Sequence, residues 1–223
     1  MRANPTPPRL HAPAALVLLA LGCVIFGTLA ADLQWHGPVT AADAAISRWF
    51  HANPLPLVTQ LMLAVTTLHS TIGIVLMATA AAAALWWGRQ FAWLSMLVLT
   101  VPGGMLLNTL VKEAFQRVRP HFDEPLLTLT SYSFPSGHTA GATLWWGFAL
   151  IWLFAHSRRT RDRVLGSVFV AAMIMLTALS RVYLGAHYPS DVLAAAAEGV
   201  IWLALCFTTL DRWSSSRRDI ANG

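Results

Sequence analysis

Long uncharged stretches alternate with short polar segments along this chain, and the pattern predicts a bundle of membrane-spanning helices. A helix needs about 20 predominantly apolar residues to cross a bilayer. The predicted spans cover residues 12–31, 71–87, 91–110, 139–154, 164–179 and 192–210. The first run ends in small residues, as a signal peptide does, but it is longer than a usual signal core and five more spans follow. It is therefore predicted to be a retained helix.

Residues 32–56 leave the membrane, because they contain charged residues and several prolines. Within them, Val39, Ala42, Ile46, Trp49 and Phe50 recur at near-helical spacing, opposite Asp43 and Arg48. This spacing predicts a short amphipathic helix at the membrane interface. Residues 57–67 predict a second such element, which is broken near His69 and Ser70.

The predicted fold class is therefore all-α: a polytopic membrane protein with six transmembrane helices and a short interfacial helix. Residues 12–210 form one membrane domain between cytoplasmic tails at 1–11 and 211–223. The composition agrees with this fold class. With 56% hydrophobic and only 11% charged residues, the chain is too apolar to cover a surface that faces water. Cys23 and Cys206 lie inside apolar runs, so a disulfide is not expected.

The basic residues predict the orientation of the bundle. If the N-terminus is cytoplasmic, that side holds Arg2, Arg9, Arg89, Arg158, Arg159, Arg161, Arg163, Arg212, Arg217 and Arg218. The other side holds Arg48, Lys112, Arg117, Arg119 and Arg181. This asymmetry follows the positive-inside rule and accounts for most of the net charge of +5, so no nucleic-acid partner is indicated. Residues 156–163 are accordingly predicted to be a topological anchor rather than a head-group site.

Three polar motifs fall in the two loops on the far, extracytoplasmic side. They are residues 112–120 (KEAFQRVRP), 135–138 (PSGH) and 180–191 (SRVYLGAHYPSD). They read as K-x6-R-P, P-S-G-H and S-R-x5-H-x3-D. Six spans can scatter such motifs over both faces, so their position on one face predicts a single site.

Lys112, Arg119 and Arg181 stand next to apolar helix ends, where a lone cation usually extends toward the interface. Three cations from separate segments instead favour a pocket for a phosphoryl group, whose charge is spread over its equatorial oxygens. Arg supplies two-pronged donation and Lys a point charge. Arg117 stands outside the motif positions and is predicted to be a solvated or head-group residue.

Ser136 and Gly137 directly precede an apolar helix, where such a pair can serve as a simple cap and turn. The same geometry presents free backbone N–H groups and the positive end of the helix dipole to an anion. His138 follows, in position to protonate a leaving oxygen.

His187 and Asp191 are four residues apart, a spacing that places two helical side chains on one face. The carboxylate can hold one imidazole nitrogen while the other points at a substrate. The alternatives are a buried hydrogen-bonded pair and half of a metal site. No metal is predicted, because three fixed cations would repel it and no carboxylate cluster accompanies the histidines.

Together the motifs resemble the signature of the type 2 phosphatidic acid phosphatase (PAP2) superfamily, closely over residues 103–191. The resemblance implies a helical core shared with haloperoxidases, a lipid phosphatase activity and no metal or other cofactor. It implies His187 as the nucleophile, Asp191 as its support and His138 as the general acid. The residues implied to hold the phosphoryl oxygens are Lys112, Arg119, Ser136, Gly137 and Arg181. Six spans exclude the family's soluble haloperoxidases.

The predicted protein is thus a multi-pass phosphatase of a bacterial cytoplasmic membrane, acting on a lipid phosphate or diphosphate at the extracytoplasmic surface. Undecaprenyl diphosphate is the first choice, because an outward-facing site suits carrier-lipid recycling. Phosphatidylglycerol phosphate and phosphatidate are alternatives, whereas short loops disfavour lipid A. A lipid phosphotransferase on the same fold stays open, and the oligomeric state is undetermined.

Two intramembrane polar residues lie outside the motifs. Glu198 is predicted to be a protonated structural group bonded to a neighbouring helix, although a carboxyl group within a span is also a candidate functional residue. Asn108 is predicted to tie helix ends together or to orient Lys112. A small transporter with His187, Asp191 and Glu198 as its polar pathway would leave the P-S-G-H and K-x6-R-P motifs unexplained.

Overall fold

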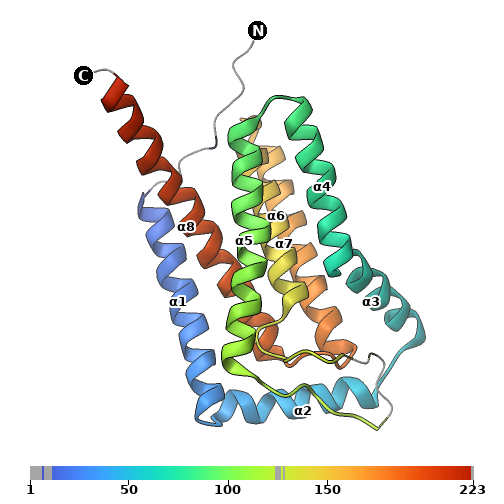
Figure 1. Ribbon diagram of the computed structural model, residues 1–223. Coiled ribbons are helices and arrows are strands. Elements are labelled where there is room, and N and C mark those ends of the chain that lie inside the picture. Colours follow the sequence, from blue (N-terminus) through green and yellow to red (C-terminus); the bar gives the residue numbers. More distant parts are fainter. Residues whose placement is uncertain (1–6, 8–11, 124–126, 128, 222–223) are drawn as a thin grey trace.

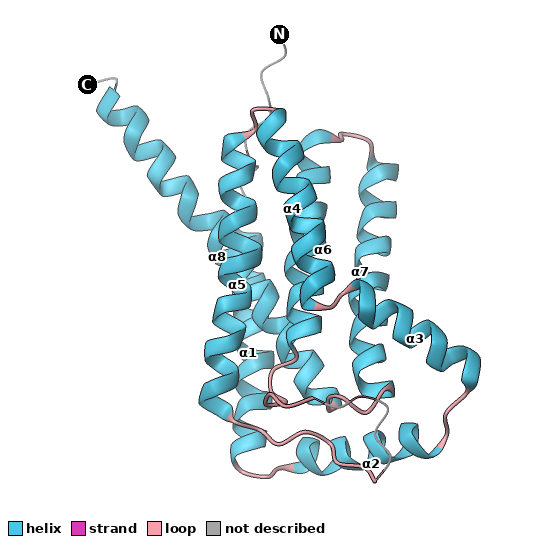
Figure 2. Ribbon diagram, turned by 45° about the vertical axis from the view of Figure 1, so that its right-hand side comes forward, coloured by secondary structure: helices cyan, strands magenta, loops and turns pink. Residues whose placement is uncertain are grey.

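The structure is a computed structural model that describes residues 7, 12–123, 127 and 129–221, with the backbone alone beyond Thr208. The predicted tail at 1–11 lies outside the described residues apart from residue 7. Within the described part the chain forms helices joined by loops and turns, and no strand occurs there (Figure 2). The predicted all-α class is confirmed.

The described residues contain eight helices, which Figure 1 labels in chain order. They are α1 (Ala12–Gln34), α2 (Pro38–Ala52), α3 (Pro56–Leu68), α4 (Thr71–Trp87), α5 (Phe91–Phe115), α6 (Gly137–His156), α7 (Thr160–Tyr183) and α8 (Pro189–Ala221). Helices α1, α5 and α7 run in one direction along the bundle, and α4, α6 and α8 run in the other (Figure 1). Helix α1 begins, and α8 ends, at the end of the bundle opposite α2.

Helix α6 lies at the centre and packs against α4, α5, α7 and α8. The apolar core between these helices is built from large side chains such as Trp93, Leu144, Phe148 and Phe207. Many outward-facing leucines and valines, including Leu16 and Val168, are exposed in the isolated chain. That distribution suits a bundle whose outer surface contacts lipid.

Four of the described helices are long and apolar enough to cross a membrane singly: α1, α5, α7 and α8 as far as Thr208. Helices α3 and α4 meet that criterion together, bent by 49° at their junction. Helix α6 has 20 residues but falls outside this group, since its sequence is rich in Gly, Thr and Trp. A helix surrounded by other helices needs less apolar surface than one that faces lipid. The described helices thus offer up to five candidate spans of the six predicted, and α6, the remaining predicted span, packs among them at the centre of the bundle.

Some predicted boundaries differ from those of the structure. Residues 57–67 fall within α3, a separate helix as predicted, and α3 and α4 together are long and apolar enough for one bent span. Ser70 caps α4 by accepting a hydrogen bond from the Gly73 amide at 3.1 Å, which explains the break. Helix α5 runs on to Phe115, so Lys112 is helical rather than part of a loop. Helix α8 continues to Ala221 through the predicted tail.

The polar end of the bundle carries α2, the described residues between α5 and α6, and the short turn between α7 and α8 (Figure 1). Helix α2 lies across this end, as an interfacial helix should. Its buried residues are polar, Asp43 and Ser47, whereas Val39, Ile46 and Trp49 are exposed. The polar face of α2 therefore points into the protein.

Because α1 begins and α8 ends at one end while the motif segments gather at the other, the orientation of the bundle can be tested. A reporter fused after Gly223 is expected to behave as cytoplasmic, and one inserted in the 122–130 segment as periplasmic. Paired phosphatase and fluorescent fusions at both positions measure this. The reverse pattern would overturn the positive-inside orientation.

Candidate active site

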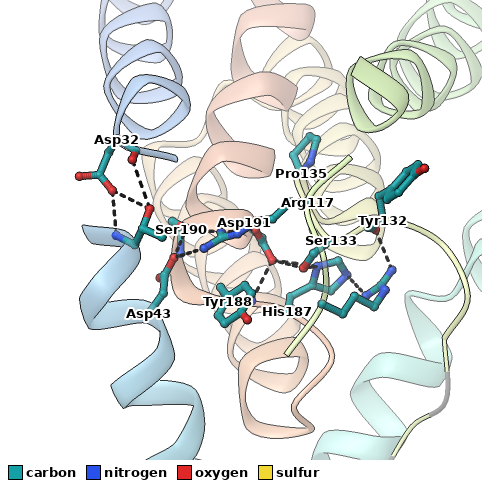
Figure 3. Close-up of polar contacts among 12 residues, drawn as sticks. Asp32, Asp43, Arg117, Tyr132, Ser133, Pro135, His187, Tyr188, Ser190 and Asp191 are labelled. Atoms are coloured by element: carbon teal, nitrogen blue, oxygen red, sulfur yellow. Dashed lines mark hydrogen bonds and ion pairs between the residues drawn. The ribbon is translucent and has the colours of Figure 1, made fainter. Parts of the chain in front are cut away.

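The centre of the polar end is the carboxylate of Asp191, which is fully buried in the first turn of α8. Its Oδ2 accepts hydrogen bonds from the Tyr188 amide at 2.8 Å and from the Ser133 hydroxyl. His187 Nδ1 lies 3.3 Å from the same oxygen. Figure 3 shows Asp191 between Ser133 and His187 on one side and Ser190 and Arg117 on the other. His187 precedes α8, which begins at Pro189, so the turn before the helix, rather than a shared helical face, brings the imidazole and the carboxylate together.

His187 is held from its other side by Arg119. The Nη1 atom of Arg119 lies 3.0 Å from His187 Nε2 and donates to the Ala186 carbonyl at 2.6 Å. Because a guanidinium only donates, Nε2 must accept and the imidazole proton sits on Nδ1, toward Asp191. Burial lowers the pKa of His187, although the Asp191 contact acts in the opposite direction. The imidazole is therefore neutral, with its Nε2 lone pair on the Arg119 side.

Lys112, in the last turn of α5, is buried and donates to the carbonyls of Tyr132 at 2.9 Å and Pro135 at 2.8 Å. Arg119 binds the same segment through the Ser131 carbonyl at 2.6 Å and the Tyr132 carbonyl at 3.1 Å. The two cations thus fix the backbone that leads into α6. An ammonium group has three donors, so these two bonds leave Lys112 one more to give.

Ser136 is the residue that precedes α6, and its amide donates to the Asp191 carbonyl at 3.1 Å. Its side chain makes no capping bond to the helix. The amides of the first turn, from Gly137 onward, have no partner within the helix and are available to an anion. His138 is partly exposed in this turn and has no hydrogen-bonding partner among the described residues.

Arg181 reaches the site from the last turn of α7 and is 2% exposed. Its Nη1 donates to the Thr66 hydroxyl of α3. Its Nε is buried without a partner among the described residues. An unpaired donor on a buried cation is costly, so this guanidinium is poised to bind an anionic ligand.

The sequence of the chain matches known proteins. A family model described as the PAP2 superfamily matches residues 91–215. The phosphatidylglycerophosphatase B of Bacillus subtilis (strain 168) is 31% identical over 180 residues, which cover 80% of this chain and 87% of that protein. The chain belongs to the PAP2 superfamily.

Other PAP2 relatives differ in their named substrates. A lipid A 1-phosphatase of Rhizobium etli is 41% identical over 120 residues, covering 49% of this chain and 46% of that protein. The undecaprenyl-diphosphatase BcrC of Bacillus subtilis is 32% identical over 107 residues, covering 46% and 50%. The crystal structure of a transmembrane PAP2-type phosphatidylglycerolphosphate phosphatase from Bacillus subtilis superposes with a TM-score of 0.73 at 25% identity, over 89% of this chain and 96% of that one. This chain is a membrane-embedded phosphatase, a phosphoric ester hydrolase.

Arg117 corrects the sequence-based interpretation of this PAP2 chain. It was predicted to be a solvated or head-group residue, but it is 8% exposed and its side chain binds the first turn of α8. Its Nη1 lies 2.6 Å from Asp191 Oδ1, and its Nη2 lies 2.8 Å from Asp43 Oδ2. Each carboxylate stands 74 residues from Arg117 in the sequence. No local sequence pattern predicts such a pairing. The contact of Ser133 with Asp191 was missed for the same reason.

Asn108 and Glu198 form a buried polar contact outside the three motifs. Asn108 Nδ2 donates to Glu198 Oε2 at 2.7 Å, which joins α5 to α8. Glu198 Oε1 is buried without a partner among the described residues. The predicted bond from Glu198 to a neighbouring helix is confirmed, and Asn108 is the residue that makes it.

Proposed function

We propose that this protein hydrolyses a lipid phosphate through a phosphohistidine formed on Nε2 of His187. The observation that carries the proposal is the position of that nitrogen: it lies beside the Arg119 guanidinium, which can only donate to it, and Asp191 supports the opposite nitrogen. A nucleophilic nitrogen must be unprotonated, and the charge that develops on the imidazole needs a nearby carboxylate. Both requirements are met at His187.

The phosphoryl group is held by Arg181, Arg119, Lys112 and the backbone amides that follow Ser136 and Gly137. The unpaired Nε of Arg181 supports this assignment, because a phosphoryl oxygen would give that buried donor its partner. Arg119 contacts both His187 and the segment leading into α6, so it can stabilise the phosphoryl oxygens next to the attacking nitrogen.

The reaction proceeds in two displacements. Nε2 of His187 attacks phosphorus, and the bond from phosphorus to the lipid oxygen breaks while His138 donates a proton to that oxygen. Water then attacks the phosphohistidine, its proton passes to His138, and the N–P bond breaks to release inorganic phosphate. His138 takes the acid–base role that the PAP2 motif implies. Burial and the nearby Arg181 lower the pKa of its ring, so the negative charge of a bound phosphoryl group is needed for the ring to carry the proton.

For the substrate, phosphatidylglycerol phosphate comes first. The phosphatidylglycerophosphatase B relative aligns along most of both chains, whereas the undecaprenyl-diphosphatase and lipid A relatives align over about half. Undecaprenyl diphosphate, the preference drawn from the sequence, stays the second candidate because an outward-facing site suits carrier-lipid recycling. The site would open at the extracytoplasmic face of a bacterial cytoplasmic membrane. Transfer of the phosphoryl group to a second lipid, in place of water, would appear as a labelled lipid product without phosphate release.

The first prediction concerns the covalent intermediate. His187→Ala is expected to abolish turnover and the acid-labile, base-stable phosphoprotein, because the nucleophile is lost. Asp191→Asn keeps the shape but loses the charge, so kcat should fall by roughly 10²–10⁴-fold. Rapid-quench trapping with labelled lipid measures both effects. Labelled protein that persists in His187→Ala would refute the assignment.

The second prediction concerns the source of positive charge at phosphorus. Activity is expected to survive EDTA and to be inhibited by vanadate, since the Lys and Arg side chains supply the charge that a metal would otherwise provide. Phosphate release from purified protein, with and without chelator, measures this. Activity that EDTA abolishes and Mg²⁺ restores would show that the site depends on a divalent ion.

The third prediction separates the substrate classes. A phosphomonoester expels a basic alkoxide that needs a proton, while a diphosphate expels a monophosphate that needs little help. General acid catalysis contributes roughly 10²–10⁴-fold where it is required. His138→Ala should therefore lose much more kcat/KM on phosphatidylglycerol phosphate than on undecaprenyl diphosphate. A lipid panel on wild type and variant measures this, and a wild-type preference for undecaprenyl diphosphate would reverse the order of candidates.

A further inference from the structure

Asp43 is a buried carboxylate on α2, outside all three motifs, and it contacts the catalytic end of α8 directly. Its Oδ1 accepts the Ser190 amide at 2.9 Å, and its Oδ2 accepts the Ser190 hydroxyl. Arg117 Nη2 donates to Oδ2 at 2.8 Å. Asp43 is 1% exposed, so its charge depends on these partners.

Arg117 joins this carboxylate to Asp191. Its Nη1 donates to Asp191 Oδ1 at 2.6 Å and to Ser190 Oγ at 2.7 Å, and its guanidinium lies 4.1 Å from the centre of the Tyr188 ring. Figure 3 shows Asp43, Ser190 and Arg117 on the side of Asp191 away from His187. Oδ1 is thereby held by the guanidinium, which leaves Oδ2 for His187 Nδ1, Ser133 and the Tyr188 amide.

We propose that Asp43 and Arg117 are positioning residues that fix the Asp191 carboxylate against His187. The inference rests on the proposed roles of His187 and Asp191. Arg117 alone would sit against Asp191 as a full positive charge and weaken its support of an imidazolium. Asp43 shares that charge, so Asp191 keeps its orientation and more of its negative potential.

The choice of residues favours this role over simple docking of α2. Replacing a buried ion pair by well-packed apolar groups is often neutral or stabilising. A buried Asp–Arg–Asp chain is therefore a weak way to stabilise the packing of α2 against α8. The chain instead fixes the orientation of the carboxylate groups, because each carboxylate oxygen accepts a hydrogen bond from a defined donor. Among the described residues, neither Asp43 nor Arg117 hydrogen-bonds to Arg181, Lys112 or His138, so phosphoryl binding should be independent of the Asp43–Arg117–Asp191 contacts.

A double-mutant cycle tests the proposal, with kcat and KM for labelled phosphatidylglycerol phosphate as the readout. Asp43→Asn should lower kcat about 10-fold, as outer partners that orient active-site ligands do in metal enzymes, with KM nearly unchanged. In the Asp191→Asn background, Asp43→Asn should cause no further loss, because there is no longer a carboxylate to position. Arg48→Gln, on the exposed face of the same helix, is the matched control and should behave like wild type.

Ser190→Ala provides a second, milder route, since it removes a hydroxyl from both Asp43 and Arg117 without changing any charge. Its kcat should fall roughly 2–10-fold, and this loss should also vanish in the Asp191→Asn background. If Asp43→Asn yields no folded protein by gel filtration in detergent, the Ser190→Ala measurements test the positioning role instead.

The possible outcomes are distinct. Losses that are additive with Asp191→Asn, or an unchanged kcat in Asp43→Asn and Ser190→Ala, would overturn the positioning role while leaving the proposed function standing. Wild-type turnover in Asp191→Asn would instead refute the proposed role of Asp191, and this inference with it.

Discussion

The carboxylate of Asp191 has no exposed surface, and groups from separate parts of the chain satisfy it. Arg117 and Ser133 come from the segment between α5 and α6, whereas His187 and Tyr188 come from the turn before α8. Taking one partner from a buried ion pair leaves an uncompensated charge and costs about 3–5 kcal/mol. These segments are therefore tied to α8 at the same point, and the geometry of the site follows from that tie.

The arginines around this carboxylate differ in what remains for a ligand. Both terminal nitrogens of Arg117 are bonded to carboxylates, so its charge is already committed. Arg181 has a hydroxyl partner and a buried Nε without one among the described residues, which supports its proposed role as a ligand of the phosphoryl group. Arg119 lies between these cases, because it binds carbonyl groups and also touches His187. The partner, rather than the residue type, separates a structural cation from a ligand-binding one.

The sequence predicted what depends on local pattern. The bounds of α4 agree with the predicted 71–87, and the three motifs meet at one end because helices of span length place their connecting loops alternately at the two ends. What could not be predicted are contacts between residues far apart, such as Arg117 with Asp43 across 74 positions. An arginine in a loop is usually exposed to solvent, and a single sequence does not show that Arg117 pairs with a buried carboxylate. The break between α3 and α4 was visible in the sequence, but the 49° angle at which the two helices meet depends on packing.

Helix α2 shows why the usual reading of amphipathic segments fails at this surface. In a water-soluble protein the apolar stripe of a helix marks its buried face. At a membrane interface the surroundings can accept apolar groups, so Val39, Ile46 and Trp49 can face outward. The inward face is then free to be polar, and Asp43 uses it to reach Arg117 and Ser190. A charged side chain is costly within the membrane spans. At the end of the spans, where apolar side chains of α2 can face the interface, a carboxylate such as Asp43 can point into the protein. A phosphatase of this kind needs fixed charges there.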